Sequence, residues 1–534
     1  MNIKTVGLGL IAFLLISVPV SAMASLLENL TIGNAKALAL GNAVTADPPG
    51  VDSIHYNPAG LARIKGREGQ VNLNAVRLEF DLDFGAYHPD AQAQIDSWGL
   101  GVDDPVENSS GSTAVVALKV PFVSGREEWP LPVVTLPSGG AATHIESGNY
   151  TIASAAFVPY AAGYIRDDDD PARFMGKELS LTRLTYFSPS IGFKINDQLS
   201  VGAGIHFSYQ GLSAYTDIRV SSIILGVINT ALSQLEEGSD CLGDAFTLCG
   251  QSVNPFEQSV TLEVDVETGM SVTGVFGALW EPTPWLSWGF VYHTEAKNRM
   301  SGTYRMTYSD DWQGIFNTVR EELGYIGAFL RLPPAAAVLT GDAKMELKNP
   351  AHFATGVSIA LLPNWKLNVD AKWTDWSVWE ALVIEYDQPQ EFLVVASLLA
   401  PEYATPTTLA FPRNYSSVWN FAFGVEHQYN NNLALRLGWE PRKSSIPDHK
   451  QGVLLPLGDG DLYSAGLGYK WSADQHIDLA VGMFRANANI PAGTSTNSNS
   501  MDVYNNILYN PYSGLDIKTQ VSAYFMELNY RFQF

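Results

Sequence analysis

Apolar residues recur at every second position over much of this chain, and this period restricts the folds open to it. Near the C-terminus the apolar positions are Tyr524, Met526, Leu528, Tyr530, Phe532 and Phe534, with Glu527, Asn529, Arg531 and Gln533 between them. The same alternation is present in segments 199–209, 286–292, 433–439, 463–471 and 477–483. Successive side chains of a strand point to opposite faces, so each segment is predicted to be a strand with one apolar and one polar or small face. Such strands build either a β-sandwich or a membrane barrel.

Two classes of connection separate these strands, and they favour the barrel. Short links lie at 196–198, 281–284, 362–364, 429–431 and 472–475. Long links lie between them, at 214–257, 309–340, 388–413, 444–459 and 488–517. Short turns on one rim and long loops on the other are typical of outer-membrane barrels. The terminal Phe534 also favours a barrel, and a secreted β-sandwich with uneven loops is the alternative.

The alternation predicts an all-β fold, a transmembrane antiparallel β-barrel of about fourteen strands, which is an even number as in single-chain bacterial barrels. The expected strands are 70–84, 112–123, 150–165, 182–195, 199–213, 258–280, 285–307, 342–361, 365–386, 415–428, 432–441, 461–472, 475–487 and 519–534. The stretch 85–180 is the least regular, because the Pro-rich segment 124–150 stands where a short turn should join the second and third strands.

Composition excludes several other classes of protein. Only 16% of the residues are charged, which is low for a soluble domain. The 55 acidic residues against 32 basic ones give a net charge of −23, which would repel the phosphates of a nucleic acid. Residues 1–24 have a basic start at Lys4, an apolar stretch and the small-residue sequence Ala22-Met23-Ala24, and therefore predict a secretory signal peptide cleaved before Ser25.

Residues 25–66 precede the first strand and do not alternate. They are rich in Ala, Gly, Asn and Leu and contain the breaker Asp47-Pro48-Pro49-Gly50. Since a barrel of this size encloses a lumen that would leak, we expect 25–66 to form a small, mostly helical hatch inside it, with 67–534 as the barrel. An exposed periplasmic tail is the alternative.

Several motifs resemble the long-chain fatty acid transporter family of Gram-negative outer membranes. The clearest are Gly41-Asn42-Ala43-Val44-Thr45-Ala46-Asp47, followed by Asn57-Pro58-Ala59-Gly60-Leu61-Ala62, both in the expected hatch. Tyr292-His293-Thr294-Glu295, Trp373-Thr374-Asp375-Trp376-Ser377 and Ser445-Ile446-Pro447-Asp448 follow in the order expected for the family.

This resemblance implies a hatch-plugged barrel of 14 strands in the cell outer membrane that takes up hydrophobic small molecules by passive diffusion. Ligand would be captured between two extracellular loops, pass to a pocket in the barrel, and leave sideways into the bilayer after the hatch shifts. Asn57, Pro58 and Ala59 would belong to the hatch. Long-chain fatty acids are the expected substrates, with monoaromatic hydrocarbons as the alternative, and a monomer surrounded by outer-membrane lipids and lipopolysaccharide is expected.

Two long loops contain apolar residues at helical spacing, which predicts an amphipathic helix in each. The first carries Ile224, Ile228 and Leu232, and the second carries Trp312, Phe316 and Val319. These faces form either an apolar capture groove or a simple contact between the two helices. Cys241 and Cys249 lie close together in the first loop, which predicts a loop-tying disulfide in an oxidising compartment, with two free thiols as the alternative.

A fatty-acid carboxylate needs a cationic or hydrogen-bonding partner in an apolar pocket. Arg219 falls near the position at which the family places a basic residue, so it is the candidate. The sequence predicts no cofactor and no metal site, because the Asp167–Asp170 run lacks a calcium-loop pattern. It also predicts no catalytic residue. An outer-membrane lipid hydrolase using His206 or His293 beside a Ser, an adhesin and a non-specific porin remain the other functional classes.

Overall fold

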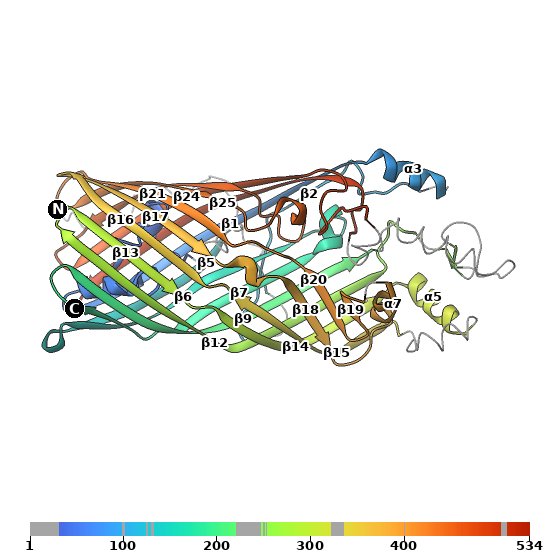
Figure 1. Cartoon of the computed structure of the whole chain (residues 1–534), viewed down its shortest axis with the longest axis horizontal. Helices are drawn as coiled ribbons and strands as arrows, with labels where there is room; N and C mark the ends of the chain where they lie inside the picture. The colour runs from blue at the N-terminus through green and yellow to red at the C-terminus, as the bar shows by residue number, and fades with distance from the viewer. Residues whose placement is uncertain are drawn as a thin grey trace, which may run out of the picture.

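A computed structural model describes residues 31–98, 102–123, 127–129, 133–219, 247–248, 251–252, 254–321, 336–399, 401–502 and 510–534. The chain forms a closed antiparallel barrel of 14 wall strands, several of which are interrupted and therefore carry two labels. The predicted signal peptide lies outside the described residues. Figure 1 shows the C-terminus at the rim with the short turns, and the helices α3, α5 and α7 at the other rim.

The wall strands follow one another around the barrel in chain order. The first half comprises β1 Arg67–Tyr87, β5 Val134–Ile145, β6 Tyr150–Ile165, β7 Glu178–Phe187 with β8 Ser190–Lys194, β9 Leu199–Ile218, β12 Val260–Thr283, and β13 Leu286–His293 with β14 Ala296–Tyr308. The second half comprises β15 Val338–Asn349 with β16 His352–Leu362, β17 Trp365–Thr374 with β18 Ala381–Tyr386, β20 Thr408–Pro412 with β21 Val418–Gln428, β22 Leu433–Arg442, β23 Gly460–Lys470, β24 Gln475–Ile490 and β25 Leu515–Gln533. The barrel closes where β25 pairs with β1, from Glu68↔Gln533 to Tyr87↔Leu515.

The predicted second strand, 112–123, is wrong. Residues Ser110–Thr113 form β2, which pairs only with Phe80–Asp83 of β1, and Val116–Leu118 form β3, which pairs with β4, Glu127–Trp129. The wall strand is β5, inside the segment that its prolines suggested was a loop. It is joined to β6 by a tight turn in which Asn149 has a φ of 56°, so the short-turn rule holds here as well.

The polarity of the alternation reverses partway along β1 and along β25, the strand that closes the barrel against it. In the lower part of β1, Val71 and Leu73 point outward and are about half exposed, while Asn72 points into the lumen. In the upper part, Phe80 and its alternate neighbours Val76, Leu78, Leu82 and Phe84 are buried inside. Lipid therefore surrounds the lower part of the barrel, which is nearest the short turns. The lumen is polar in this lower part and apolar in the upper part, nearest the long loops, which is the upper lumen.

The N-terminal segment, residues 31–66, lies in the polar half of the lumen (Figure 1, blue). It contains short helices, with the bounds α1 Ala35–Ala39, η2 Gly50–Asp52, α2 Ser53–Tyr56 and η3 Pro58–Arg63. Its apolar residues, including Ile54 and Leu61, pack with one another and against Ala155 and Phe157 of β6. The segment is too short for an independent core, so the barrel wall completes it.

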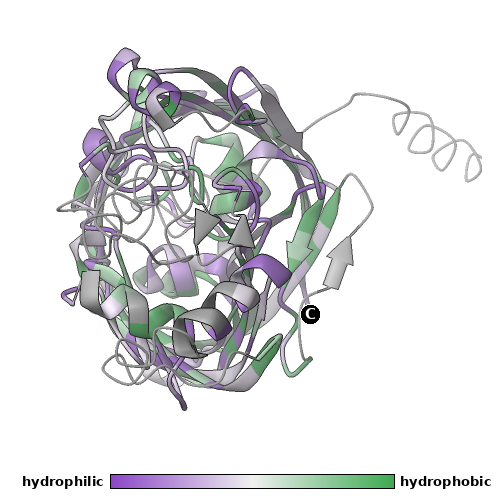
Figure 2. Cartoon of the chain, turned by 90° about the vertical axis from the view of Figure 1, so that its right-hand side faces the viewer, coloured by the Kyte–Doolittle hydropathy of each residue, from purple (hydrophilic) through white to green (hydrophobic). Residues whose placement is uncertain are grey.

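The remaining helices and short strands belong to the connections. They are α3 Pro89–Trp98, η4 Glu146–Gly148, η5 Pro171–Met175, β10 Thr247–Leu248, β11 Gln251–Ser252, α5 Asp310–Glu321, η6 Trp376–Val378, α7 Glu391–Leu399, β19 Ala404–Thr405 and η7 Asp448–Lys450. Viewed from the long-loop end, these segments gather around and across the mouth of the closed wall (Figure 2), except η4, which lies in the short β5–β6 turn at the other rim, and η6, which interrupts a wall strand between β17 and β18. Among the described residues, no helix combines the length and the apolar character needed to cross a membrane.

Candidate transport site

Asn57 anchors the N-terminal segment to the wall. Its side chain is fully buried and caps η3, accepting from the backbone N–H of Ala59 at 3.2 Å. Its Nδ2 donates to the carbonyl of Thr45 at 2.9 Å and to that of Ala278, on β12, at 3.1 Å. A Cβ atom on the facing Gly277 would lie 2.1 Å from Oδ1 of Asn57, so only glycine permits this approach.

Two aspartates of the segment have opposite electrostatic environments. Asp47 forms ion pairs with Lys36 (2.9 Å), Arg63 (3.4 Å) and Lys366 of β17 (3.0 Å). Burial opposes ionisation, but these three cations together hold the pKa of Asp47 well below its usual value. Asp52 instead accepts from the amides of Asn34 and Asn72, both at 2.8 Å, and burial raises its pKa to about 6. One carboxylate thus secures the segment electrostatically, and the other costs desolvation energy.

The barrel wall has a break between β5 and β6. The two strands pair only from Ile145↔Tyr150 to Gly139↔Ala156, although β5 continues along β1 as far as Val134↔Val76. Beyond Ala156, β6 pairs with β7, apart from a single bridge between Ile165 and Val115, and its register shifts between Phe157 and Tyr160. Pro137 and Pro159 lie on the two separated stretches. Proline has no N–H to donate to a ladder, so it belongs at a strand edge.

A small cavity of about 30 Å³ lies at this break. It is bounded by β1, β5, β6 and β25 and by Gly33 of the N-terminal segment, and its lining includes Val76, Leu136, Val158, Tyr160 and Phe525. Glu527 of β25 is the carboxylate among the lining residues. An apolar molecule in the lumen therefore meets, next to the N-terminal segment, a stretch of wall in which β5 and β6 are not hydrogen-bonded to each other.

A second, small cavity of about 50 Å³ lies at the long-loop end. Met175, Leu409 and Phe411 supply apolar surface, while Arg413 and Lys450 supply two cations. Arg413 is only 6% exposed, and its Nε has no hydrogen-bond partner among the described residues. Burial, and then the charge of Arg413, lower the pKa of Lys450. Within the described part of the chain neither cation has a carboxylate partner, so the cavity matches an amphipathic anion.

The predicted head-group residue Arg219 lies just beyond β9 and is buried. Its guanidinium forms a bidentate ion pair with Asp104, at 2.8 and 3.0 Å, and donates from Nε to the carbonyl of Pro511 at 2.8 Å. A ligand carboxylate at Arg219 would have to replace Asp104. Arg219 stays a prediction, and Arg413 and Lys450 are the cations that sequence reasoning missed.

The predicted groove is described only in part. Trp312 lies on α5, is half-buried, and packs against the apolar cluster of the upper lumen. Phe316 and Val319 lie on the same helix. Ile224, Ile228, Leu232, Cys241 and Cys249 lie outside the described residues, so the groove and the disulfide stay predictions.

The wall, the lumenal N-terminal segment and the apolar upper lumen define a class of protein, a plugged outer-membrane β-barrel. The chain belongs to the outer membrane protein transport protein family (OMPP1/FadL/TodX), whose family model matches residues 13–534. It is therefore an outer-membrane transporter of hydrophobic compounds, and it comes from a transporter family rather than an enzyme family.

Known proteins agree with this assignment. The chain is 23% identical over 192 residues to a long-chain fatty acid transport protein of Escherichia coli O6:H1, an alignment that spans 36% of this chain and 40% of that protein. Its fold resembles a Pseudomonas aeruginosa FadL homologue, with a TM-score of 0.66, 17% identity, and coverage of 95% and 99% of the two chains. It also resembles the Ralstonia pickettii toluene transporter TbuX, with a TM-score of 0.57, 16% identity and the same coverage.

Proposed function

We propose that this protein takes up long-chain fatty acids and binds their carboxylate at Arg413 and Lys450. The observation that carries this proposal is a pair of cations that have no carboxylate partner among the described residues, in a cavity whose lining also includes the apolar side chains of Met175, Leu409 and Phe411. A neutral hydrocarbon would leave both charges uncompensated, which is costly at a buried guanidinium. A fatty acid supplies the missing negative charge and an acyl chain for the apolar surface.

The apolar upper lumen gives the acyl chain a path inward. Each methylene gains about 0.8 kcal/mol on leaving water, so a chain favours this half of the lumen over the polar half occupied by the N-terminal segment. That segment acts as the hatch, and the break between β5 and β6 is the side exit. Release into the bilayer there avoids transfer of the chain through water.

Uptake by whole cells tests the substrate. Cells without their own hydrophobic-compound transporters, expressing this chain, are given radiolabelled oleate or radiolabelled toluene. Oleate uptake that falls in the Arg413→Met, Lys450→Met double variant supports the proposal. Toluene uptake alone would identify a hydrocarbon channel and overturn it. If a folded, surface-exposed barrel takes up neither ligand, that result would overturn both the fatty-acid proposal and the hydrocarbon alternative, and would favour an adhesin or a lipid hydrolase.

A matched control removes a charge elsewhere on the same rim. Lys443 is exposed and pairs with Asp459. Lys443→Met should leave oleate uptake unchanged, because this charge faces water and already has a partner. An equal loss of uptake in the control and the double variant would mean that the overall rim charge, rather than the cavity, affects uptake.

A further inference from the structure

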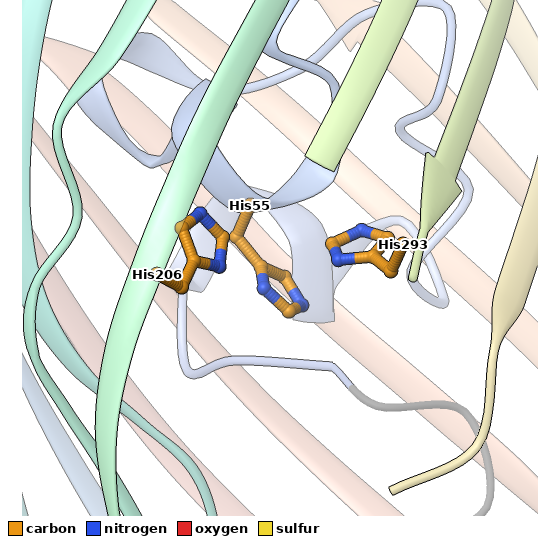
Figure 3. Close-up of side chains that lie close together, drawn as sticks. All are labelled: His55, His206 and His293. Atoms are coloured by element: carbon orange, nitrogen blue, oxygen red, sulfur yellow. The ribbon is translucent and has the colours of Figure 1, made fainter. Parts of the chain in front are cut away.

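Three histidines meet where the N-terminal segment contacts the wall (Figure 3). His55 comes from α2, His206 from β9 and His293 from the end of β13. The register places His206 opposite Thr273 and His293 opposite Val275, so the two wall histidines lie on either side of β12. His55 brings a third ring from the N-terminal segment. Since the three residues are far apart in the chain, their spacing in the sequence carries no signal of this cluster.

The geometry suits a shared ligand. One ring nitrogen from each histidine can be chosen so that all three lie within 4.8 Å of one another. The ring centres of His55 and His293 are 4.9 Å apart, and that of His206 is 6.3 Å from each. Ligands of a tetrahedral Zn²⁺ are about 3.4 Å apart, given Zn–N bonds of about 2.0–2.1 Å. Rotations of the rings would supply the contraction, of up to about 1.4 Å, that is needed.

Hydrogen bonding leaves a nitrogen of His206 available. Nε2 of His206 is buried and has no hydrogen-bond partner among the described residues, while the other side of the ring hydrogen-bonds to the backbone of Ile54. His293 hydrogen-bonds to the backbone of His55. In metal sites a ligating histidine usually donates its second N–H to a carbonyl or carboxylate, which fixes the tautomer and orients the ring. The same arrangement exists here.

The surroundings are compatible with a cation. All three rings are buried, with exposures of 7%, 3% and 8% for His55, His206 and His293. Arg183 is the cation beside His206 and donates to the hydroxyl of Ser271 at 3.0 Å. On the other side, His352 packs against His293, with Lys372 beyond it, whose charge is paired with Glu440 at 2.8 Å. Neutral imidazoles prefer Zn²⁺, Cu²⁺ or Ni²⁺ over the oxygen-seeking Mg²⁺ and Ca²⁺.

We propose that His55, His206 and His293 bind a divalent transition-metal ion such as Zn²⁺, which links the N-terminal segment to the barrel wall. Ligands from a movable segment and from two strands of a fixed wall make the bound ion a cross-link between them. The metal-bound protein therefore holds this segment in its docked position. That effect on transport rests on the proposed function, because it requires the segment to move, whereas metal binding does not.

The first experiment measures binding alone. The full chain, purified in detergent with an affinity tag free of histidine, is treated with EDTA, dialysed and titrated with Zn²⁺ by calorimetry and metal analysis. We expect one saturable site per chain. His206→Gln and His293→Gln should each lower the affinity at least about tenfold. His427→Gln is the control, because His427 lies on β21, stacks on Trp365 and takes no part in the cluster.

The variants must be folded for this comparison, which heat-dependent mobility on a denaturing gel reports for a barrel. If the wall variants misfold, His55→Asn replaces them, since it leaves every wall residue unchanged. Absence of a saturable site, or an affinity that is the same in the wild type and in the folded cluster variants, would overturn the proposal.

A second readout tests the cross-link. Zn²⁺ should slow backbone hydrogen exchange of residues 50–60 in the wild type and leave it unchanged in His55→Asn. Stoichiometric binding without this protection would overturn the cross-link. Oleate uptake should also fall with Zn²⁺ in the wild type alone. Because binding and exchange need no substrate, they distinguish failure of this proposal from failure of the transport assignment.

Discussion

Removal of the Arg413 charge should weaken the binding of a fatty acid and spare its neutral analogue. Arg413 is 6% exposed, so its interaction with a carboxylate is little screened by water. A hydrogen bond to a charged partner contributes about 1.5–3 kcal/mol, and each 1.4 kcal/mol is tenfold in affinity. Arg413→Met should therefore raise the Kd for oleate about 10- to 150-fold. Lys450 is half-buried and its charge is screened by water, so Lys450→Met should raise the Kd for oleate only a few-fold.

Equilibrium binding to the purified protein in detergent measures this effect. Radiolabelled oleate and oleyl alcohol have the same chain length and differ in the head group, so the ratio of their dissociation constants isolates the carboxylate. We expect Arg413→Met to reduce that ratio and to leave oleyl alcohol binding nearly unchanged. An equal loss for both ligands would show that Arg413 only supports the shape of the cavity, and no loss for oleate would refute the head-group assignment.

Three further predictions concern the N-terminal segment and the side exit. Asn57→Ala leaves three buried backbone groups without their partner, at a cost on the order of 3 kcal/mol, so hydrogen exchange of residues 50–60 should accelerate while the barrel still assembles; unchanged exchange would contradict the anchoring role. Leu136→Trp should fill the cavity at the β5–β6 break and slow oleate uptake without weakening binding, whereas Thr135→Trp, on the outward face, should not; equal uptake in the two would argue against this exit. The pKa of Asp52, about 6, lies above its ordinary value of 3.8, so the folded protein binds this proton more tightly and loses docking free energy as pH rises from about 4 through 6, with about 1.4 kcal/mol of the loss between pH 5 and pH 7.5. Asp52→Asn should therefore reduce the difference in hydrogen exchange between pH 5 and pH 7.5, although Arg531, Glu527 and Tyr56 lie nearby; a difference equal to that of the wild type would assign the pH dependence to other groups.

The second strand shows where local reasoning about the chain failed. Residues 124–150 contain several prolines, and proline disrupts an internal strand because it cannot donate to a neighbour. In this barrel Pro137 is compatible with a wall strand, because β6 does not pair with β5 at this position and no N–H is needed on that side. The pairing of the two strands ends at Gly139↔Ala156, before Pro159. The two prolines, 22 positions apart in the chain, would have indicated a break only to a reader who already knew that their strands were adjacent.

The cations were missed for a related reason. Arg413 stands between β20 and β21 of one wall strand and Lys450 in the long connection after β22, and no spacing rule relates them. The reversal of polarity along β1 was, in contrast, available from the sequence. Val71 and Leu73 occupy one alternation phase and Val76 to Phe84 the other, which marks the height at which lipid gives way to water outside the barrel and at which the lumen becomes apolar.

The sequence by itself determined the transmembrane barrel, the turns at one rim, the loops at the other and the family. These follow from period-two alternation and short motifs, which are local properties that a strand needs wherever it lies. Only the tertiary structure decided which residues meet across the lumen: Asn57 with β12, the two cations at the long-loop end, Pro137 with Pro159, and the three histidines. Barrel closure and register bring these groups together across separations that range from 22 to more than 200 residues, and neither is encoded in the spacing of any one segment.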